Sequence, residues 1–425
     1  MMIIDKVRAF IEKEHLISSR KEILLVALSG GADSVALLHI LRKLGYHCIA
    51  LHCNFWLRDR ESLRDEEFVT NLCKKLNVPL YKTNFDTFAY AKQQAISIEM
   101  AARELRYQWF FKLKEELSAS SIAIAHHIDD TIETLLLNLI RGTGIKGLTG
   151  IPTHNQGIIR PLLCVYRKEI EAYLDAIGQT YVTDSTNLED EYTRNKIRLN
   201  LIPLMEEINP SIKKTLNDTI SYLRETEKIY LHSIHHSLTK VYSNNKIDIK
   251  KLLKEPSPST ILYEILYPKG FTPQQIESIC QVLTEQSGKQ FYSADWRILK
   301  DRDYLLLKKR ESKSTPPQLK YEEIKYSADF IIPKNKHIAC LDKDKLKGPL
   351  TIRKWEQGDY FIPFGMKGRK KISDYLTDNK YSLFDKEDLW VLCSGESIAW
   401  LINERIDNRF AIDNSTQSVL IIKEE

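Results

Sequence analysis

The sequence has 425 residues, of which 43% are hydrophobic and 28% charged, as expected for a globular protein of two or three domains. Its seven scattered cysteines form no CxxC pair, which argues against zinc, iron–sulfur and dithiol-redox sites and favours reduced thiols in the cytoplasm. No apolar run reaches about eighteen residues, so no membrane span is expected, and the mild net charge of +5 does not by itself indicate nucleic acid.

The first third of the chain alternates short apolar runs with helical periods. Strands are expected at ILLVALS (23–29), CIALHC (48–53), VPLYKTNF (78–85) and SIAIAHH (121–127), and helices at 34–44, 59–76, 98–117 and over DDTIETLLLNLI (129–140). This alternation predicts a doubly wound, Rossmann-like parallel sheet covered by helices on both faces. Ligands of such sheets bind beyond the carboxyl ends of the strands, where Ser29, His52 and His126 fall.

The pattern changes after about residue 209. Long, charged helical stretches follow, and a polar segment at 308–323, KKRESKSTPPQLKYEE, is typical of a linker. Short alternating runs at 335–425 favour a small mixed or β-rich domain. We therefore expect a first domain at 1–215, a mainly helical domain with its linker at 216–330, and a small mixed α/β domain at 335–425.

The string SGGADS follows the first strand and opens the first helix of the sheet. Backbone N–H groups of such a loop bind anions, and the two glycines allow a phosphate to approach closely. No lysine follows, so this is not the loop of the phosphoryl-transferring NTPases. A plain turn with an aspartate cap is the simpler alternative for two glycines alone. For ATP binding the string offers Ser29, Gly30, Gly31, Ala32, Asp33 and Ser34.

The stretch AHHIDDTIETL, residues 125–135, gathers acids and histidines at the fourth strand end. His126, Asp130 and Glu133 lie at i, i+4 and i+7, which is one helical face if the helix begins near His126. Helix capping explains one aspartate. Two aspartates, a glutamate and a histidine indicate a site that binds Mg²⁺ or manages a proton, with Asp33 and Asp129 as candidate metal ligands.

Three further segments carry arginine or lysine. Arg106 either makes a surface pair with an acid or points at ATP phosphates, whereas Arg194 and Arg198 open a helix after the turn-forming residues 184–187 and leave a phosphate or RNA contact open. On charge alone, the C-terminal group of basic residues is a solvated loop; it comprises Lys367, Arg369, Lys370 and Lys371.

Together these motifs resemble the tRNA(Ile)-lysidine synthase family of PP-loop ATP pyrophosphatases. The landmarks, in order, are SGGADS, HCNFWLR (52–58), EMAARELRY (99–107), AHHIDDTIETLL (125–136), RGTGIKGLTGI (141–151), RPLL (160–163), DSTN (184–187) and RNKIR (194–198). The segment RKWEQGDYFIPFGMKGRKKISDYL (353–376) is similar to the family's last domain.

The resemblance implies a ligase that forms a carbon–nitrogen bond. ATP, with Mg²⁺, would adenylate the wobble cytidine of a CAU-anticodon tRNA-Ile, and free L-lysine would then displace AMP. By motif, the activity candidates are Asp33, Arg106, His126, Asp130, Glu133 and Arg198. Asp130 and Glu133 are the preferred contacts of the lysine amine, and Arg194 and the basic loop (367–371) would contact tRNA. A homodimer is left open.

One segment departs from the family pattern. Phe55 and Trp56 stand where the family usually has His-Gly, and Trp disfavours the positive φ that Gly permits, so the loop is expected to run differently. Two rivals remain. A PP-loop tRNA 2-thiolation enzyme would usually carry paired cysteines, and a catalytically inactive tRNA-binding protein would not need Asp33, Asp130 and Glu133.

Overall fold

The computed structural model describes residues 2–57, 59–183, 193–310, 315–327 and 329–424, with the backbone alone at 59 and 60. The chain forms two compact units, Met1–Tyr230 and Leu231–Glu425, each with its own hydrophobic cores. The limit between the units falls inside one long helix, α11 (Ile212–Val241). The three domains expected from the sequence, at 1–215, 216–330 and 335–425, stay a prediction.

The first unit is built on a six-stranded sheet in the order β3-β2-β1-β4-β6-β5. Five of the strands run parallel, and β5 is antiparallel at one edge. The strands are β1 (Ile23–Ala27), β2 (His47–Asn54), β3 (Leu80–Asn84), β4 (Ser121–Ala123), β5 (His154–Asn155) and β6 (Ile158–Ile159). The expected doubly wound parallel sheet is confirmed.

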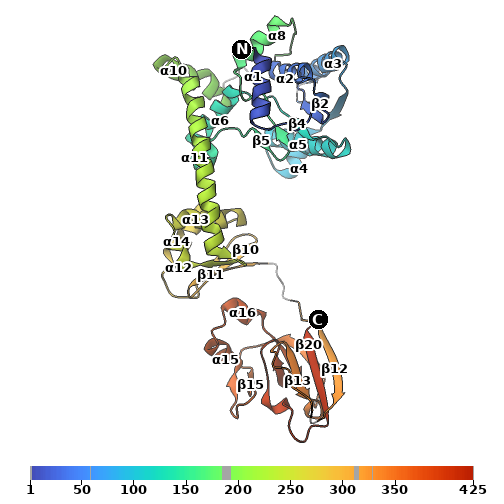
Figure 1. The fold of residues 1–425 in the computed structure, drawn as a ribbon, viewed down its shortest axis with the longest axis vertical. Coiled ribbons are helices and arrows are strands. Elements are labelled where there is room, and N and C mark those ends of the chain that lie inside the picture. Colours follow the sequence, from blue (N-terminus) through green and yellow to red (C-terminus); the bar gives the residue numbers. More distant parts are fainter. Residues whose placement is uncertain (1, 58, 184–192, 311–314, 328, 425) are drawn as a thin grey trace. The chain divides into compact units, whose positions relative to one another are not determined.

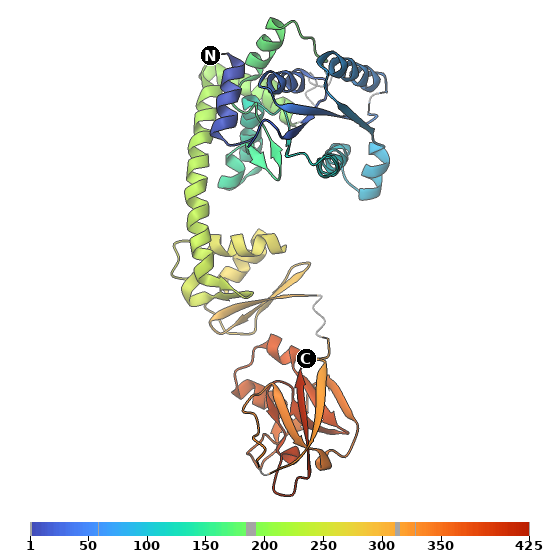
Figure 2. The ribbon, with the colours of Figure 1, turned by 45° about the vertical axis from the view of Figure 1, so that its right-hand side comes forward.

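Helices cover both faces of this sheet (Figures 1 and 2). In β1, Leu24 and Val26 belong to the core beneath α2, whereas Leu25 belongs to the core on the opposite face. This alternation follows from the period of two along a strand, and fully apolar strands are what a sheet buried on both faces requires. The helices around the sheet are α1 (Ile3–Lys13), α2 (Ala32–Lys43), α3 (Asp59–Leu76), α4 (Thr87–Gln94), α5 (Ile98–Glu116), α6 (Ile128–Arg141), α7 (Ile145–Leu148) and α8 (Arg167–Ala176).

Two local features differ from the expectation. Helix α6 begins at Ile128, one residue before the expected segment, and a reciprocal capping box between His127 and Asp130 marks this start, so His126 lies outside the helix. The β5–β6 hairpin was not expected, since each strand has only two residues. Its turn, Gln156–Gly157, has positive φ at both positions, as hairpins of this kind need.

Three short helical segments precede α11. They are α9 (Thr193–Lys196), the π-helix η2 (Ile197–Leu201) and α10 (Ile202–Ile208). Ile197 and Ile202 pack with Ile128 and Ile132 of α6 in one hydrophobic cluster. This packing holds the Arg194 and Arg198 backbone against the helix that carries Asp130 and Glu133.

The second unit begins with helices, as expected, and also contains a sheet that was not expected. The helices after α11 are α12 (Ile249–Leu252), α13 (Pro258–Leu266) and α14 (Pro273–Gln281). The antiparallel sheet has the order β7-β8-β11-β10-β9, from β7 (Tyr242–Ser243), β8 (Lys246–Asp248), β9 (Gln290–Tyr292), β10 (Trp296–Asp301) and β11 (Tyr304–Lys309). Three of its strands have only two or three residues, whereas β10 and β11, with six residues each, were long enough to predict and were missed.

The C-terminal part of the second unit is a small mixed α/β structure, as predicted. Its largest sheets have the orders β12-β20-β13 and β14-β17-β18-β19. The expected linker at 308–323 is partly wrong, because Leu319–Lys325 forms β12 and pairs with β20. The other elements are β13 (Ile338–Asp342), β14 (Leu350–Lys354), β15 (Tyr360–Phe361), β16 (Lys370–Lys371), α15 (Ile372–Asp378), α16 (Leu383–Asp388), β17 (Trp390–Ser394), β18 (Ser397–Leu401), β19 (Arg405–Ile406) and β20 (Ser418–Glu424).

Candidate active site

The SGGADS loop connects β1 to α2 and is held by its own serines. Ser34 Oγ accepts the Gly30 N–H at 3.2 Å and donates to the Gly31 carbonyl at 2.9 Å. Gly31 caps α2 without a side-chain hydrogen bond, which leaves the first turn of the helix open to an anion. The loop therefore has the form of a phosphate cradle, and it contains all six predicted ATP-binding residues.

Gly30 is required by the loop geometry. Its φ is +98°, and a Cβ added there would lie 3.4 Å from Val69 and 3.5 Å from Phe68 of α3. Only glycine adopts this backbone conformation without strain. These distances are ordinary van der Waals contacts, so the positive φ and not a lack of space is what requires glycine here.

Two cavities flank the loop. One, of about 610 Å³, is lined by Asp33, Asp129, Asp130 and Glu133; we name it the acidic cavity, and these four residues the acid cluster. The other, of about 270 Å³, is lined by Arg106, His126, Cys53 and Phe55, and we name it the His126 cavity. Ser29, Gly31, Asp33 and Asp130 line both cavities.

Asp33 lies at the meeting point of the two cavities. Its Oδ2 accepts Arg167 Nη1 at 2.5 Å, whereas the buried Oδ1 has no hydrogen-bond partner among the described residues. Burial raises the pKa of the Asp33 carboxyl, against the opposing effect of His127 and Arg167. A carboxylate with one bare, desolvated oxygen at a phosphate cradle is suited to bind a cation.

This bare oxygen fits a magnesium ion better than the Asp129 carboxylate does. Mg²⁺ is usually held by one or two carboxylates together with phosphate oxygens, which the cradle would bring. Asp129 Oδ2 accepts the Arg167 N–H at 2.9 Å, and its Oδ1 lies 3.1 Å from Lys213 Nζ. No group of three metal-ligating side chains occurs in the part of the chain that is described. Asp33 thus remains the fitting candidate, and Asp129 is already neutralised.

Glu133 is the most deeply buried member of the acid cluster, with 1% of its side chain exposed. Its Oε1 accepts Arg198 Nε at 2.6 Å, and its Oε2 accepts Arg194 Nε at 2.7 Å. Arg194 also reaches Asp130 Oδ1 at 2.8 Å. Arg194 was expected to contact tRNA, but here its guanidinium group pairs with the acid cluster.

Arg106 extends from α5 to the His126 cavity. Its buried Nε has no hydrogen-bond partner within the described ranges, and its guanidinium carbon lies 5.3 Å from the Tyr107 ring centroid. The alternative of a surface pair with an acid is therefore not supported by the geometry. A guanidinium group beside the phosphate cradle is suited to a phosphate oxygen.

His126 precedes α6 and lines the same cavity as Asp130. The face expected from the i, i+4, i+7 spacing is wrong for His126, because it lies outside the helix. His126 and Asp130 nevertheless line the same cavity, because α6 begins shortly after the end of β4. Burial lowers the pKa of His126 to about 4, although the Asp130 charge acts to raise it.

The loop after β2 contains Phe55 and Trp56, the two residues that depart from the family pattern. Trp56 adopts a φ of 51°, so the left-handed conformation is kept without glycine. Asn54 Oδ1 accepts the Trp56 N–H at 3.0 Å and supports this turn, and 45% of Trp56 is exposed. Trp56 thus takes the positive φ that tryptophan disfavours, and a loop path different from the family pattern stays a prediction. Arg58 and residues 184–187 lie outside the described residues.

Four residues that contact the site were not among the predicted site residues, and two of them, Arg167 and Lys213, lie outside every quoted motif. Arg167, Lys213 and His127 contact Asp33 or Asp129, and Arg160 contacts His126. Arg160 and its partner His126 are 34 residues apart in the sequence, and Arg167 and its partner Asp33 are 134 residues apart. Arg160 stood in the RPLL landmark, which was the one available signal for it.

The predicted tRNA-contacting basic loop belongs to the second unit. It joins β15 to β16, and Lys367, Arg369 and Lys371 are exposed. Arg369 lies over Tyr360, 4.6 Å from the ring centroid, and Lys370 pairs with Asp378 at 2.7 Å. Three cations of the loop thus remain open to solvent.

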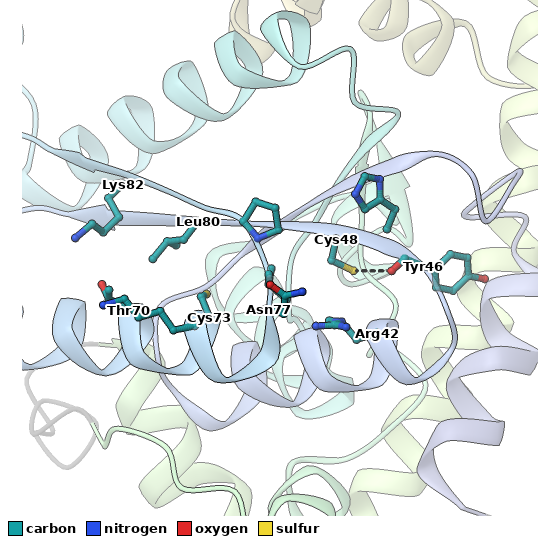
Figure 3. Close-up of a pocket in the computed structure, with 12 residues that line it drawn as sticks. Arg42, Tyr46, Cys48, Thr70, Cys73, Asn77, Leu80 and Lys82 are labelled. Atoms are coloured by element: carbon teal, nitrogen blue, oxygen red, sulfur yellow. Dashed lines mark hydrogen bonds between the residues drawn. The ribbon is translucent and has the colours of Figure 1, made fainter.

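A further cavity, of about 710 Å³, lies at the other edge of the sheet (Figure 3). His47 begins β2 and Leu80 begins β3, so this cavity is at the amino ends of the strands. None of the predicted activity residues lines it, and its cysteines, Cys48 and Cys73, have pKa values raised by burial to about 12 and about 11. This cavity is therefore separate from the predicted activity residues.

Known proteins resemble this chain over its whole length. The PP-loop domain family matches residues 2–205, and the TilS substrate binding domain family matches residues 242–310. The tRNA(Ile)-lysidine synthase of Bacteroides thetaiotaomicron is 57% identical, covering 99% of this chain and 100% of its own. Those of Parabacteroides distasonis and Porphyromonas gingivalis strain W83 are 50% identical (99% of each chain) and 40% identical (96% of this chain, 95% of the relative).

Among the described residues, no helix is both long and apolar enough to cross a bilayer. The PP-loop, the acid cluster and the full-length similarity to three named relatives lead to the same assignment. The chain belongs to the tRNA(Ile)-lysidine synthase family.

Proposed function

We propose that this chain ligates free L-lysine to C2 of the wobble cytidine in a CAU-anticodon tRNA-Ile, and so changes the codon read from AUG to AUA. ATP is consumed to AMP and pyrophosphate through an adenylated tRNA intermediate. The observation that carries the proposal is the position of Asp130, which lines both the cavity beside the phosphate cradle and the cavity of the acid cluster. One residue thus connects the ATP side with a site for a cationic amine.

In the first step, cytosine O2 attacks the α-phosphorus of ATP and the bond to the β-phosphate oxygen breaks. The loop N–H groups and the Ser29 and Ser34 hydroxyls bind the leaving pyrophosphate. Arg106 faces the α-phosphate from the His126 cavity. Asp33 would hold Mg²⁺, which neutralises phosphate charge when it is bound.

In the second step, the lysine ε-amine attacks C2, the bond from C2 to the adenylate oxygen breaks, and AMP leaves. The attacking amine must first lose a proton. We assign Asp130 to accept it, because its side chain lines both cavities, although its Oδ1 accepts Arg194 and its Oδ2 accepts the His127 N–H before substrate binds. Glu133 and Arg198 form the deeper part of the lysine site.

The second unit would hold the tRNA. Its basic loop presents exposed cations, whose attraction to phosphates does not depend on sequence. We assign tRNA contacts to Lys367, Arg369, Lys370 and Lys371, and we retain Arg194 only as a support of the acid cluster. All seven cysteines are free, which suits a reducing cytoplasm. The homodimer stays a prediction.

The test is incorporation of labelled lysine into a CAU-anticodon tRNA-Ile transcript by the purified full-length protein with ATP and Mg²⁺. We expect labelled tRNA together with stoichiometric AMP and pyrophosphate. The methionine tRNA with the same anticodon is the matched control substrate and should stay unlabelled. Sulfur or ammonia transfer to the transcript in place of lysine would overturn the proposal in favour of another PP-loop activity.

A further inference from the structure

Arg160 contacts His126 from the chain that leaves β6. It is 6% exposed, and its Nε donates to His126 Nδ1 at 3.1 Å. Its Nη1 donates to the Pro152 carbonyl at 2.8 Å, and its backbone N–H donates to the Thr153 carbonyl at 3.0 Å. Both the backbone and the guanidinium group are therefore fixed before any substrate arrives.

This contact determines where the imidazole carries its proton. A guanidinium group has five donors and no acceptor, so the nitrogen that faces it must present a lone pair. His126 Nδ1 is then unprotonated, and the ring is neutral with its single proton on Nε2. The ring edge opposite Arg160 is left for the cavity that His126 lines.

The arginines around His126 lower its pKa, and one carboxylate raises it. Asp130 of α6 favours a charged ring, whereas Arg160, Arg194 of α9 and Arg106 of α5 oppose it. Burial is the largest influence and also disfavours the charge, so the pKa of His126 lies at about 4. The ring is neutral throughout the range from pH 5 to pH 8.

A second histidine at the same sheet edge has the opposite arrangement. His52, at 4% exposure near the end of β2, places Nδ1 2.8 Å from the Leu28 carbonyl oxygen. A carbonyl oxygen only accepts, so the proton of a neutral His52 must be on Nδ1. The chain thus contains an internal reference for the two imidazole tautomers.

We propose that Arg160 is a positioning residue that fixes His126 as a neutral Nε2–H donor facing the adenylation cavity. This inference rests on the proposed function. In that role His126 donates a hydrogen bond to the α-phosphate or to the adenylated cytidine and takes no proton from lysine. The lysine proton therefore goes to a carboxylate, for which Asp130 is placed.

The direct test is nitrogen-15 NMR of the histidine rings in the full-length protein between pH 5 and pH 8, with His126→Gln to assign the signal. We expect His126 as a neutral Nε2–H ring that does not titrate in this range, and His52 as the Nδ1–H ring. In Arg160→Met, the pKa of His126 should rise above its value of about 4, because one opposing charge is lost while Asp130 remains beside the ring, and the proton should no longer be confined to Nε2. An Nδ1–H or titrating His126 in the unmodified protein would overturn the inference.

Kinetics separate positioning from a purely structural role. Pyrophosphate release by Arg160→Met should fall about 10-fold at pH 8 and acquire a dependence on the new His126 ionisation, which the unmodified enzyme lacks. Arg160→Lys, whose ammonium also donates to Nδ1, should restore the Nε2–H ring and the flat profile. An equal loss at every pH with an unchanged His126 ring would contradict the inference. Failure of the unmodified protein to use lysine would instead contradict the proposed function, without altering the NMR result.

Discussion

In the acid cluster, Glu133 is 1% exposed and holds two guanidinium groups, whereas Lys367, Arg369 and Lys371 of the basic loop are exposed to solvent. The buried charges have fixed partners at 2.6 to 2.8 Å, so their removal leaves an unpaired charge in a poorly solvated place. Removal of an exposed charge changes the stability of the folded chain little. We therefore expect the first group to affect geometry and chemistry, and the second to affect salt-dependent attraction.

The largest effect is expected at Asp33. Asp33→Asn should lower the rate of pyrophosphate release by about 10²–10³-fold, since the charged oxygen at the phosphate cradle is lost. The midpoint of thermal unfolding should not fall in step, because burial already raises the pKa of the Asp33 carboxyl and disfavours its charged form. Both quantities are measured on the same preparation.

Asp5→Asn is the matched control, because Asp5 lies on α1 and its carboxylate pairs with Arg8 at 3.3 Å. It should leave pyrophosphate release unchanged. A rate within twofold of the unmodified enzyme for Asp33→Asn would place the chemistry elsewhere.

Glu133→Ala should have the largest effect on stability. Arg194 and Arg198 would lose a carboxylate that is 1% exposed, and we expect the free energy of unfolding to fall by about 3 kcal/mol. This is the lower end of the usual range because both arginines are more than a third exposed. Urea denaturation measures the change.

Glu225→Ala is the control for an exposed pair. Glu225 lies 2.8 Å from Lys228 with 70% of its side chain exposed, so the expected change is within about 0.5 kcal/mol. If the free energy of unfolding fell equally in the two variants, buried and exposed charges would not differ in their contribution to stability.

Trp56 tests whether backbone strain is stored beside the site. Trp56→Gly should raise the free energy of unfolding by about 1 kcal/mol relative to Trp56→Ala, because Ala keeps the Cβ that disfavours a φ of 51°. Both variants lose the half-exposed indole, so their difference isolates the backbone. If the glycine variant is the less stable one in urea denaturation, the turn is not strained.

Substitutions in the basic loop should have the smallest effect on the fold. Changing Lys370 and Lys371 together to Ala should reduce the slope of log affinity for tRNA against log salt concentration by about 1 to 2. Filter binding over a salt series measures the slope. Changing Lys43 and Lys75, which end α2 and α3, to Ala is the control and should leave the slope unchanged. An equal reduction in both variants would mean that the attraction is not localised in the basic loop.

The sequence predicted the elements that have long, regular periods. Helix α3 at Asp59–Leu76 has the predicted bounds, and α5 at Ile98–Glu116 differs from them by one residue. The β5–β6 and β7–β8 hairpins were missed because each has a strand of only two residues. The Asn244–Asn245 turn, with positive φ at both positions, was the local signal that could have indicated the second hairpin.

The site was predictable where it follows motifs and not where it depends on distant pairing. The phosphate loop and the acids of α6 lie at strand ends, so their convergence follows from the parallel sheet. The Arg167–Asp33 contact joins residues 134 positions apart, and no local pattern encodes it. The Trp56 turn depends on the Asn54 side chain, which outweighs the intrinsic preference of tryptophan.

We expect the carboxyl-edge site to perform the chemistry and the basic loop only to hold the tRNA. The most direct measurement is single-turnover pyrophosphate release at saturating tRNA-Ile, compared between Asp33→Asn and the Lys370, Lys371 double alanine variant. We expect release to be lost in the first variant and to match the unmodified enzyme in the second at low salt. A loss of release in the double variant under saturation, or its retention in Asp33→Asn, would contradict the claim.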